Sequence, residues 1–394
     1  MAPHLLLASR FPPMAGGTAR WLGALARHYP VGELVVSTGQ GPDGDDVDEP
    51  LPNRVERVAV PAARLRSLTG MLVWSRQAAV LARVTGAEFT WCGDLAPSGH
   101  AARWVRERVG LPFGVLAHAH EFAALRHAGH RSRLKLRSGR QLLRAASVIV
   151  ADREWTAELV RSVGEELGVP LGDDRVRVVP SGTDPARFHP GVDAAAVRRR
   201  HDLDGAPWLL TSAHLVPLDG LELVLRALQA VPAARCAVLV DGRTYDGAQR
   251  LVRDLGLVER VRLLDSVPEA DLPALYGAVR ACVGLSREAG FDADGTGMSF
   301  VEAAASGIPL VAVGRVGLPA LLDDGVSGVV VDEERPEALA AALQGLLADP
   351  DRALRLGRAA RARVERDFTW DRTARALHGI AREVARRGRE SGGA

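Results

Sequence analysis

The strongest fold signal in this chain is Asp294-Gly-Thr-Gly-Met-Ser-Phe-Val-Glu302, and Ala303-Ala-Ala-Ser-Gly-Ile-Pro309 follows it directly. A short apolar run at 281–285 precedes this stretch and another at 309–312 follows it, and both have the length of buried strands. The glycines predict a loop, and the apolar spacing from about Met298 onward predicts a helix. Strand, glycine loop, helix and strand make a βαβ unit, the building block of a parallel sheet covered by helices.

The start of this helix has the chemistry of an anion site. Its first backbone N–H groups have no partner within the helix, and they point at whatever lies in front of it, a place that suits a diphosphate. These groups belong to Gly297, Met298 and Ser299, and Phe300 follows in the same turn. Glu302 lies about one turn in and can accept hydrogen bonds from two ribose hydroxyls, and Asp294 can accept from sugar hydroxyls. An ordinary loop with a solvent-facing glutamate is the alternative.

Apolar runs and helical stretches alternate from end to end of the 394 residues. One core rarely grows past about 250–300 residues, so we expect two domains of α/β class, each Rossmann-like. The predicted strands are 4–8, 34–37, 89–91, 113–117, 147–150, 208–212, 236–241, 261–264, 281–285, 309–312 and 328–331. A strand from Val176 runs into a Pro/Gly-rich turn, 180–190, that suits a hinge. We place the domains at 1–187 and 188–371, with a basic helix at 372–394 crossing back onto the first.

Composition limits the kinds of partner. The net charge of +2 is too small to indicate nucleic acid or an anionic membrane as the main partner, although an amphipathic surface can still touch a membrane. The three cysteines, Cys92, Cys236 and Cys282, form no CxxC pair, which argues against disulfides or structural zinc and favours the cytoplasm. The N-terminal apolar run is too short for a signal peptide, and none reaches 18 residues. The acidic run 39–48 is interpreted as a solvated loop, not a calcium site.

Two further motifs follow predicted strands of the first domain. Phe11-Pro-Pro-Met-Ala-Gly-Gly-Thr18 leads into a helix, where Gly16 and Gly17 allow a phosphate group or a second substrate to approach the backbone closely. A plain tight turn is the alternative. Ala117-His-Ala-His-Glu121 ends a strand, and ligands of open α/β sheets bind at the carboxyl ends of strands. A histidine there can contact a sugar hydroxyl or move a proton, whereas a surface loop with incidental histidines is the alternative.

Together these segments resemble glycosyltransferase family 4, a group of retaining enzymes of the GT-B fold, over nearly the whole chain. Five segments carry the resemblance in the family's order. They are the glycine loop 11–18, His118 and Glu121 at an HGxE-like motif, the linker 178–184 with Phe188 (VxPNGVDxxxF in the family), 294–302 (E-x7-E, typically EGFGxxxxE) and the FxW-like 368–371. The resemblance implies two Rossmann-like domains facing each other across a cleft.

One segment departs from the family's pattern. Family members usually have GRLVPxKG where this chain has Ser212-Ala-His-Leu-Val-Pro-Leu-Asp-Gly220, so His214 and Asp219 replace an Arg and a Lys that neutralise the donor diphosphate. Coding bias does not explain this, because Lys135 is the only lysine and such bias would turn Lys into Arg. The first motif Glu is also shortened to Asp294. Either nearby arginines (Arg287 first, then Arg243 or Arg315) supply the charge, or the donor is unusual, or transfer activity is lost.

The resemblance implies a retaining, metal-independent hexosyltransferase that uses a UDP- or GDP-linked sugar, without a cofactor, and a small-molecule or lipid-linked acceptor. The first domain would bind the acceptor and the second the donor, and domain closure would exclude water. Under this reading, His118 and Asp294 are catalytic and Glu121 is on the acceptor side. The donor-binding residues would be Gly16, Gly17, His214, Asp219, Gly220, Arg287, Gly297, Met298, Ser299, Phe300 and Glu302. We expect a monomer or homodimer. The alternatives are an unusual donor or acceptor atom (N or S), or a catalytically degenerate homologue acting as a partner subunit.

Overall fold

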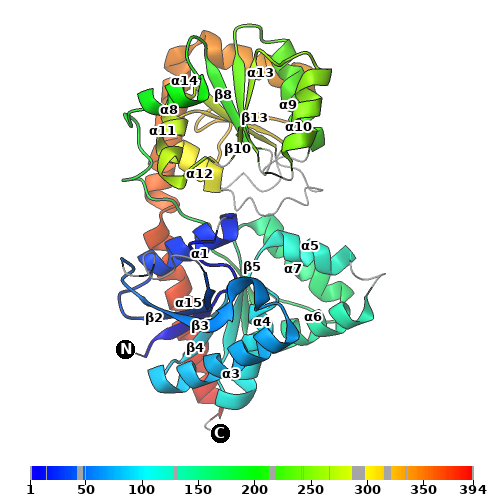
Figure 1. Ribbon diagram of the computed structural model, residues 1–394, viewed down its shortest axis with the longest axis vertical. Helices are drawn as coiled ribbons and strands as arrows, with labels where there is room; N and C mark the ends of the chain where they lie inside the picture. Colours follow the sequence, from blue (N-terminus) through cyan, green and yellow to red (C-terminus); the bar gives the residue numbers. More distant parts are fainter. Residues whose placement is uncertain are drawn as a thin grey trace. The chain divides into compact units, whose positions relative to one another are not determined.

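The chain consists of two compact units, which are drawn in Figure 1. The computed structural model describes residues 2–14, 16–41, 48, 50–127, 132–212, 218–240, 242, 244–265, 267–285, 298–314, 321–332 and 335–392. Unit 1 is Met1–Ser181 together with Trp370–Ala394, and unit 2 is Gly182–Thr369. The last helix therefore belongs to the same unit as the first strand.

Unit 1 is built on a parallel sheet of seven strands in the order β3-β2-β1-β4-β5-β6-β7. The strands are β1 His4–Leu7, β2 Leu34–Gln40, β3 Arg54–Pro61, β4 Phe89–Cys92, β5 Phe113–Ala117, β6 Val148–Ala151 and β7 Val176–Val178. The chain moves outward from β1 to β3 and then returns to the other side of β1 with β4. Since β1 and β4 are neighbours, the direction of the strand order reverses between them. The two strands pair in parallel, and His4 lies opposite Phe89.

The helices of unit 1 cover the sheet and one another. They are α1 Gly17–His28, α3 Leu68–Thr85, α4 Ser98–Val109, α5 Ala119–His127, α6 Arg133–Ala145, α7 Glu154–Glu166 and α15 Trp370–Gly392, with a short 3-10 turn η1 Ala62–Arg64. α3 packs against α4, α4 against α6, and α5 against α7, whereas α15 packs against α1 and β4. The apolar strands β1, β4, β5 and β6 are buried along their whole length, as expected for a sheet that is covered by helices on both faces.

Unit 2 repeats this plan with a parallel sheet of six strands in the order β10-β9-β8-β11-β12-β13. The strands are β8 Trp208–Ser212, β9 Arg235–Val240, β10 Val261–Asp265, β11 Ala281–Leu285, β12 Leu310–Val313 and β13 Val329–Val331. The helices are α8 Ala195–His201, α9 Leu218–Gln229, α10 Tyr245–Asp254, α11 Leu272–Ala278, α12 Met298–Ala305, α13 Pro336–Ala348 and α14 Pro350–Asp367, with a 3-10 turn η3 Glu269–Asp271. Here the reversal of strand order lies between β8 and β11.

Two apolar clusters fill the two faces of the unit 2 sheet. One joins α9, α10 and α13 to inward residues such as Val238 and Val283. The other joins α8, α11, α12 and α14 to residues such as Trp208 and Leu210, so each face is covered by its own set of helices (Figure 1). The expected α/β class with two parallel-sheet, Rossmann-like domains is confirmed. One detail differs: Asp48, expected in a solvated loop, forms a largely buried ion pair at 2.6 Å with Arg57.

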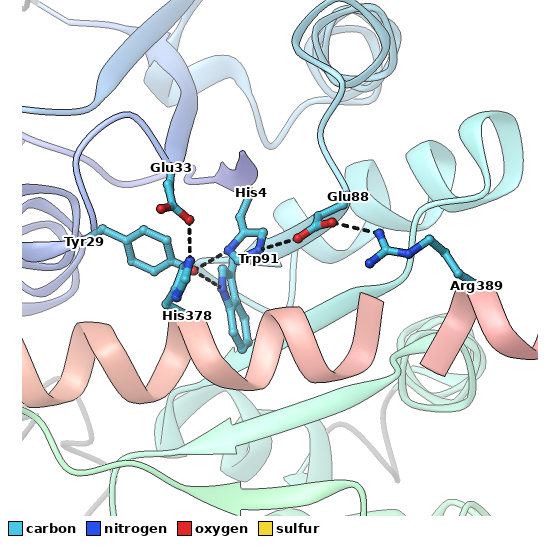
Figure 2. A network of polar contacts seen from close by, with 7 residues as sticks. All are labelled: His4, Tyr29, Glu33, Glu88, Trp91, His378 and Arg389. Atoms are coloured by element: carbon cyan, nitrogen blue, oxygen red, sulfur yellow. Dashed lines mark hydrogen bonds and ion pairs between the residues drawn. The ribbon is translucent and has the colours of Figure 1, made fainter. Parts of the chain in front are cut away.

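A polar network at the amino ends of the strands attaches α15 to unit 1, and Figure 2 shows its members. The His4 Nδ1 atom lies 2.6 Å from the Tyr29 hydroxyl, and the His4 Nε2 atom lies 3.5 Å from a carboxylate oxygen of Glu88. Glu88 also accepts a hydrogen bond at 2.8 Å from Arg389 of α15. A second contact joins α15 to the same edge, where the His378 Nε2 atom lies 2.6 Å from Glu33. Through these contacts, His378 and Arg389 hold α15 against the amino ends of the strands.

This network predicts a loss of stability in acid. Burial first, and then His378, lower the pKa of His4 to about 4, although Glu88 opposes this shift. Above pH 6.5 His4 is neutral in both states, but as the pH falls toward 4 the unfolded chain gains a proton that the folded chain does not. The free energy of unfolding of unit 1 should therefore fall by about 3 kcal/mol over that range. His4→Gln should flatten this slope in urea titrations followed by tryptophan fluorescence.

The control for this experiment is His189→Gln, because His189 is an exposed histidine of unit 2. Tryptophan fluorescence reports mainly on unit 1, since Trp208 is the only tryptophan in unit 2. A His4→Gln protein whose stability keeps the wild-type slope between pH 6.5 and 4 would contradict the prediction.

Candidate active site

In unit 2 the two candidate donor segments follow the two strands that flank the reversal of strand order. The segment with His214 follows β8, and the segment with Asp294 follows β11, the neighbour of β8 in the sheet. Ligands of open α/β sheets bind in the crevice outside the carboxyl ends of strands at such a reversal. Of the predicted residues in these segments, Asp294, Gly297, His214 and Arg287 lie outside the described residues, as do Arg243, Arg315 and the side chain of Asp219. Gly220 is buried in the first turn of α9.

Glu302 is a buried carboxylate on α12, with 4% of its surface exposed. The Tyr276 hydroxyl of α11 donates a hydrogen bond to it at 3.0 Å, and Tyr276 is itself buried. A carboxylate is costly to bury, and an apolar side chain would fill the same space of the core without that cost. Core packing therefore does not account for an acid at this position. A carboxylate held in one rotamer near the start of a helix can instead accept hydrogen bonds from a ligand.

The other residues in the first turns of α12 differ in how far they are buried. Met298 and Phe300 are buried, and Ser299 is partly exposed. Phe300, predicted as a donor contact, packs in the core against β11, where a Cβ atom at Gly284 would lie 2.0 Å from its ring. The absence of a side chain at Gly284 thus lets α12 pack closely on β11. Phe300 positions the helix, and the groups at its start that could bind an anion are backbone N–H groups.

In unit 1 a hydrogen-bonded cluster lies where β1 and β4 end side by side. The carboxylate of Asp94, just after β4, accepts hydrogen bonds from the Ser9 hydroxyl at 2.5 Å and from the Ser98 backbone N–H at 2.8 Å. All three residues are buried. Gly16 lies farther along the same β1–α1 segment with a φ of 121°, which only glycine adopts without strain, and Gly17 begins α1. Asp94 therefore ties the segment that carries both predicted glycines to the end of β4.

His118 and Glu121 meet this cluster from the end of β5. The His118 Nε2 atom lies 2.9 Å from the Gly93 carbonyl oxygen, and since a carbonyl only accepts, Nε2 carries a proton. His118 is buried, and its ring lies edge-on to Trp21 at 6.5 Å. Glu121 accepts a hydrogen bond from the Leu95 backbone N–H at 2.9 Å. The structure thus brings His118 and Glu121 together around the backbone of 93–95.

The electrostatics of this cluster favour a protonated Glu121. Burial first, and then the negative charge of Asp94, raise the pKa of Glu121 to about 8, although the Leu95 hydrogen bond and the charges of Arg10 and Arg66 oppose this shift. At neutral pH a large part of the Glu121 carboxyl therefore carries a proton and can donate a hydrogen bond.

Sequence reasoning missed three residues of these clusters: Ser9, Asp94 and Tyr276. Asp94 carried a usable signal, because an acid directly after a buried strand lies at the carboxyl edge of the sheet. Ser9 and Tyr276 carried none, since their partners become visible only with the strand and helix neighbours. Among the described residues no group of three His, Cys, Asp or Glu side chains is placed to hold a metal ion. Nor does any described helix have the length and apolar content needed to span a membrane.

Comparison with known proteins identifies a matching family. Residues 194–363 match the model of the glycosyl transferases group 1 family. The chain is 30% identical over 380 residues to a GDP-mannose-dependent alpha-(1-6)-phosphatidylinositol monomannoside mannosyltransferase of Mycolicibacterium smegmatis, covering 93% of this chain and 94% of that protein. The protein of the same name in Mycobacterium tuberculosis is 29% identical, with 96% and 97% covered.

The fold has counterparts among solved structures. Anabaena HepE in complex with UDP and glucose superposes with a TM-score of 0.75 at 18% identity, and the match covers 96% of this chain and 99% of that one. The chain therefore belongs to the group 1 glycosyltransferases, and it is a sugar-transferring enzyme of the GT-B fold that resembles family 4.

Proposed function

We propose that this enzyme transfers mannose from GDP-mannose to a hydroxyl group of a lipid-linked, inositol-containing acceptor and keeps the configuration of the sugar. The mycobacterial relatives support this donor and acceptor, because their names state GDP-mannose dependence and a phosphatidylinositol monomannoside. They also support retention, since the sugar of GDP-mannose is α-linked and the linkage that these relatives form is α. Unit 2 would bind the donor and unit 1 the acceptor.

The observation that carries the nucleotide-sugar part of this proposal is the buried carboxylate of Glu302. It lies on the helix that follows β11, next to the reversal of strand order, and Tyr276 holds it in place. Two neighbouring ribose hydroxyls can donate to its two oxygens, and the backbone N–H groups at the start of α12 can stabilise the diphosphate. As the bond from the sugar to the diphosphate breaks, negative charge grows on the leaving oxygen, and these N–H groups stabilise it.

In the transfer step the acceptor oxygen forms a bond to the anomeric carbon while the bond from that carbon to the diphosphate breaks. The acceptor proton passes to the departing phosphate oxygen on the same face, so no side chain needs to act as a strong base. His118 suits a contact with the transferred sugar better than the role of base at Nε2, because that nitrogen already donates to Gly93. From the sequence we also propose that Asp294 contacts the sugar and that Arg287 supplies a positive charge.

Isothermal calorimetry with GDP, UDP and ADP tests the donor. We expect GDP to bind most tightly, and transfer of radiolabelled mannose from GDP-mannose to phosphatidylinositol mannoside to exceed transfer from UDP-glucose. A protein that binds none of the three nucleotides would refute the donor site. Tighter binding of UDP than GDP would refute GDP-mannose while leaving sugar transfer intact.

His214 and Asp219 favour one further candidate, a degenerate homologue that binds a nucleotide or a partner enzyme without transferring sugar. A carboxylate at the position of a phosphate-binding cation repels the diphosphate at short range. The transfer assay separates the two functions, because a degenerate homologue binds GDP yet turns over no GDP-mannose with any acceptor offered.

A further inference from the structure

Asp94 is a buried carboxylate that has no part in the transfer step proposed above. It is 4% exposed, and its oxygens accept hydrogen bonds from the Ser9 hydroxyl at 2.5 Å, from the Ser9 backbone N–H at 3.4 Å and from the Ser98 backbone N–H at 2.8 Å. The last of these bonds satisfies the first N–H group of α4. Asparagine suits the start of a helix about as well as aspartate, and burying a charge costs free energy. The hydrogen bonds alone therefore do not account for a charged side chain at this position.

The residues on either side of Asp94 hold His118 and Glu121. The Gly93 carbonyl accepts a hydrogen bond from the His118 Nε2 atom at 2.9 Å, and the Leu95 N–H donates to Glu121 at 2.9 Å. The hydrogen bonds of Asp94 join this segment of three residues to the β1–α1 segment on one side and to α4 on the other. The positions of both side chains thus depend on a backbone that Asp94 fixes.

The negative charge of Asp94 also acts on the Glu121 carboxyl. Burial first, and then Asp94, raise the pKa of Glu121, against one backbone hydrogen bond and the charges of Arg10 in the β1–α1 segment and Arg66 just before α3. Burial raises the pKa of the Cys92 thiol at the end of β4, and the charges of Asp94 and Glu121 add to that shift. Since two neighbouring carboxyl groups resist ionising together, the charge on Asp94 favours a proton on Glu121.

A substrate can reach Glu121, whereas Asp94 is enclosed. Glu121 is half-buried and lies in the first turn of α5, directly after the carboxyl end of β5. This is the edge of the sheet at which ligands of open α/β folds bind. A protonated carboxyl has an O–H group that donates a hydrogen bond, and an ionised carboxylate has none. The proton on Glu121 therefore gives unit 1 a hydrogen-bond donor where the acceptor is expected.

We propose that Asp94 is a positioning residue of the transfer reaction, which fixes the backbone that holds His118 and Glu121 and keeps a proton on Glu121. The Glu121 carboxyl then donates a hydrogen bond to an oxygen atom of the acceptor. The proton stays on Glu121 throughout, so this group positions the acceptor and is not the acid or base of the transfer. The inference rests on the proposed function only in that unit 1 receives the acceptor. A residue that only satisfies the start of α4 is the alternative, and asparagine would replace it equally well at every pH.

Carbon-13 NMR measures the proton on Glu121 without any donor or acceptor. In the full chain labelled at the glutamate carboxyl carbons, the Glu121 signal is the one that Glu121→Gln removes, and it should titrate at about pH 8. Asp94→Asn should lower this midpoint by about one pH unit, as the loss of a neighbouring charge does. The matched control is Asp152→Asn, because Asp152 also directly follows a strand of this sheet and accepts a hydrogen bond at 2.7 Å from the Thr156 hydroxyl. It should leave the midpoint unchanged.

Two results of this titration overturn the proposal. One is an unchanged midpoint in Asp94→Asn. The other is a wild-type Glu121 that titrates near its ordinary value of 4.5, which needs no variant at Asp94 and so decides the matter even if Asp94→Asn does not fold.

The pH dependence of mannose transfer tests the consequence for the acceptor. The kcat/KM for the acceptor follows the protonation of the free enzyme. At pH 8, about half of the wild-type Glu121 carboxyls and about a tenth of those in Asp94→Asn would carry a proton, so the variant should be about fivefold slower. At pH 6 the two proteins should be nearly equal. His100 of α4 also feels the charge of Asp94, but burial and Arg103 lower its pKa from the ordinary 6.5, so it does not titrate near pH 8.

A purely structural role of Asp94 would lower the rate by the same factor at both pH values. That outcome, or equal rates of wild type and Asp94→Asn at pH 8, overturns the proposal. GDP should bind to Asp94→Asn as it does to the wild type, because the donor is expected in unit 2. If the proposed donor or acceptor is wrong, transfer or GDP binding fails in the wild type while the NMR titration stays as expected, so the two failures are distinguishable.

Discussion

Glu302→Gln will lower the affinity for GDP about 10- to 100-fold, the loss expected when one partner of charge-assisted hydrogen bonds becomes neutral. Glutamine has nearly the same volume, so it fills the same space beside Tyr276 and keeps an oxygen that can accept from the hydroxyl. The substitution also removes a buried charge. The melting temperature without nucleotide should therefore stay the same or rise, while kcat/KM with GDP-mannose falls with the affinity. Isothermal calorimetry and initial-rate measurements check the two effects separately.

The control for Glu302 lies at the end of the same helix. The Ser306 hydroxyl donates at 2.9 Å to the backbone oxygen of Glu302, so Ser306→Ala removes a polar contact of the same residue without touching its carboxylate. It should bind GDP as the wild type does. The GDP affinity of Tyr276→Phe should lie between the affinities of Glu302→Gln and Ser306→Ala. The carboxylate stays in this variant but loses one hydrogen bond of about 1 kcal/mol. Wild-type affinity in Glu302→Gln would show that the ribose contact is made elsewhere.

Glu121→Gln will stabilise unit 1 above neutral pH. The folded-state pKa of Glu121 is raised from 4.5 to about 8, mainly by burial. Below pH 4.5 the carboxyl is protonated in both states, and between 4.5 and 8 the unfolded chain releases a proton that the folded chain keeps. The free energy of unfolding therefore falls as the pH rises, by up to about 5 kcal/mol at 1.36 kcal/mol per pH unit. Glutamine resembles the protonated acid and does not titrate, so the variant escapes this fall.

Urea titrations between pH 5 and 9, followed by tryptophan fluorescence, check this prediction. Glu107→Gln is the control, because Glu107 is exposed and pairs with Arg103 on the surface of α4, where such pairs contribute little. Its stability should follow the wild-type curve. Parallel curves for Glu121→Gln and wild type would mean that Glu121 is ionised in the folded protein at neutral pH, and that it cannot donate a hydrogen bond there.

The sequence predicted those parts of the fold whose signals are local. His118 was located because it directly follows a buried apolar strand, and Glu302 because a glycine-rich loop lies a few residues before it. β3 was missed because Arg54–Pro61 mixes charged and apolar residues, as an edge strand with only β2 beside it can. Its one buried residue, Val58, gives no periodic pattern.

The polar contacts of the site were beyond sequence reasoning for a different physical reason. Ser9 and Asp94 are 85 residues apart, and they meet only because β1 and β4 become neighbours in the sheet. The sequence shows that both follow strands, but it does not show which strands pair. Glu302 and Tyr276 likewise meet through the packing of α11 against α12 on one face of the sheet.

The return of α15 to unit 1 has a consequence for the order in which the chain becomes structured during synthesis. Unit 2 is one continuous segment, Gly182–Thr369, so all of its strands have left the ribosome before α15 has been made. Unit 1 is interrupted by that whole segment, and until α15 emerges, His4 and Glu88 lack their partners His378 and Arg389. The N-terminal half of the polypeptide is thus the last to be completed, and a ribosome that stalls before residue 370 releases a chain with a finished unit 2 and an unfinished unit 1.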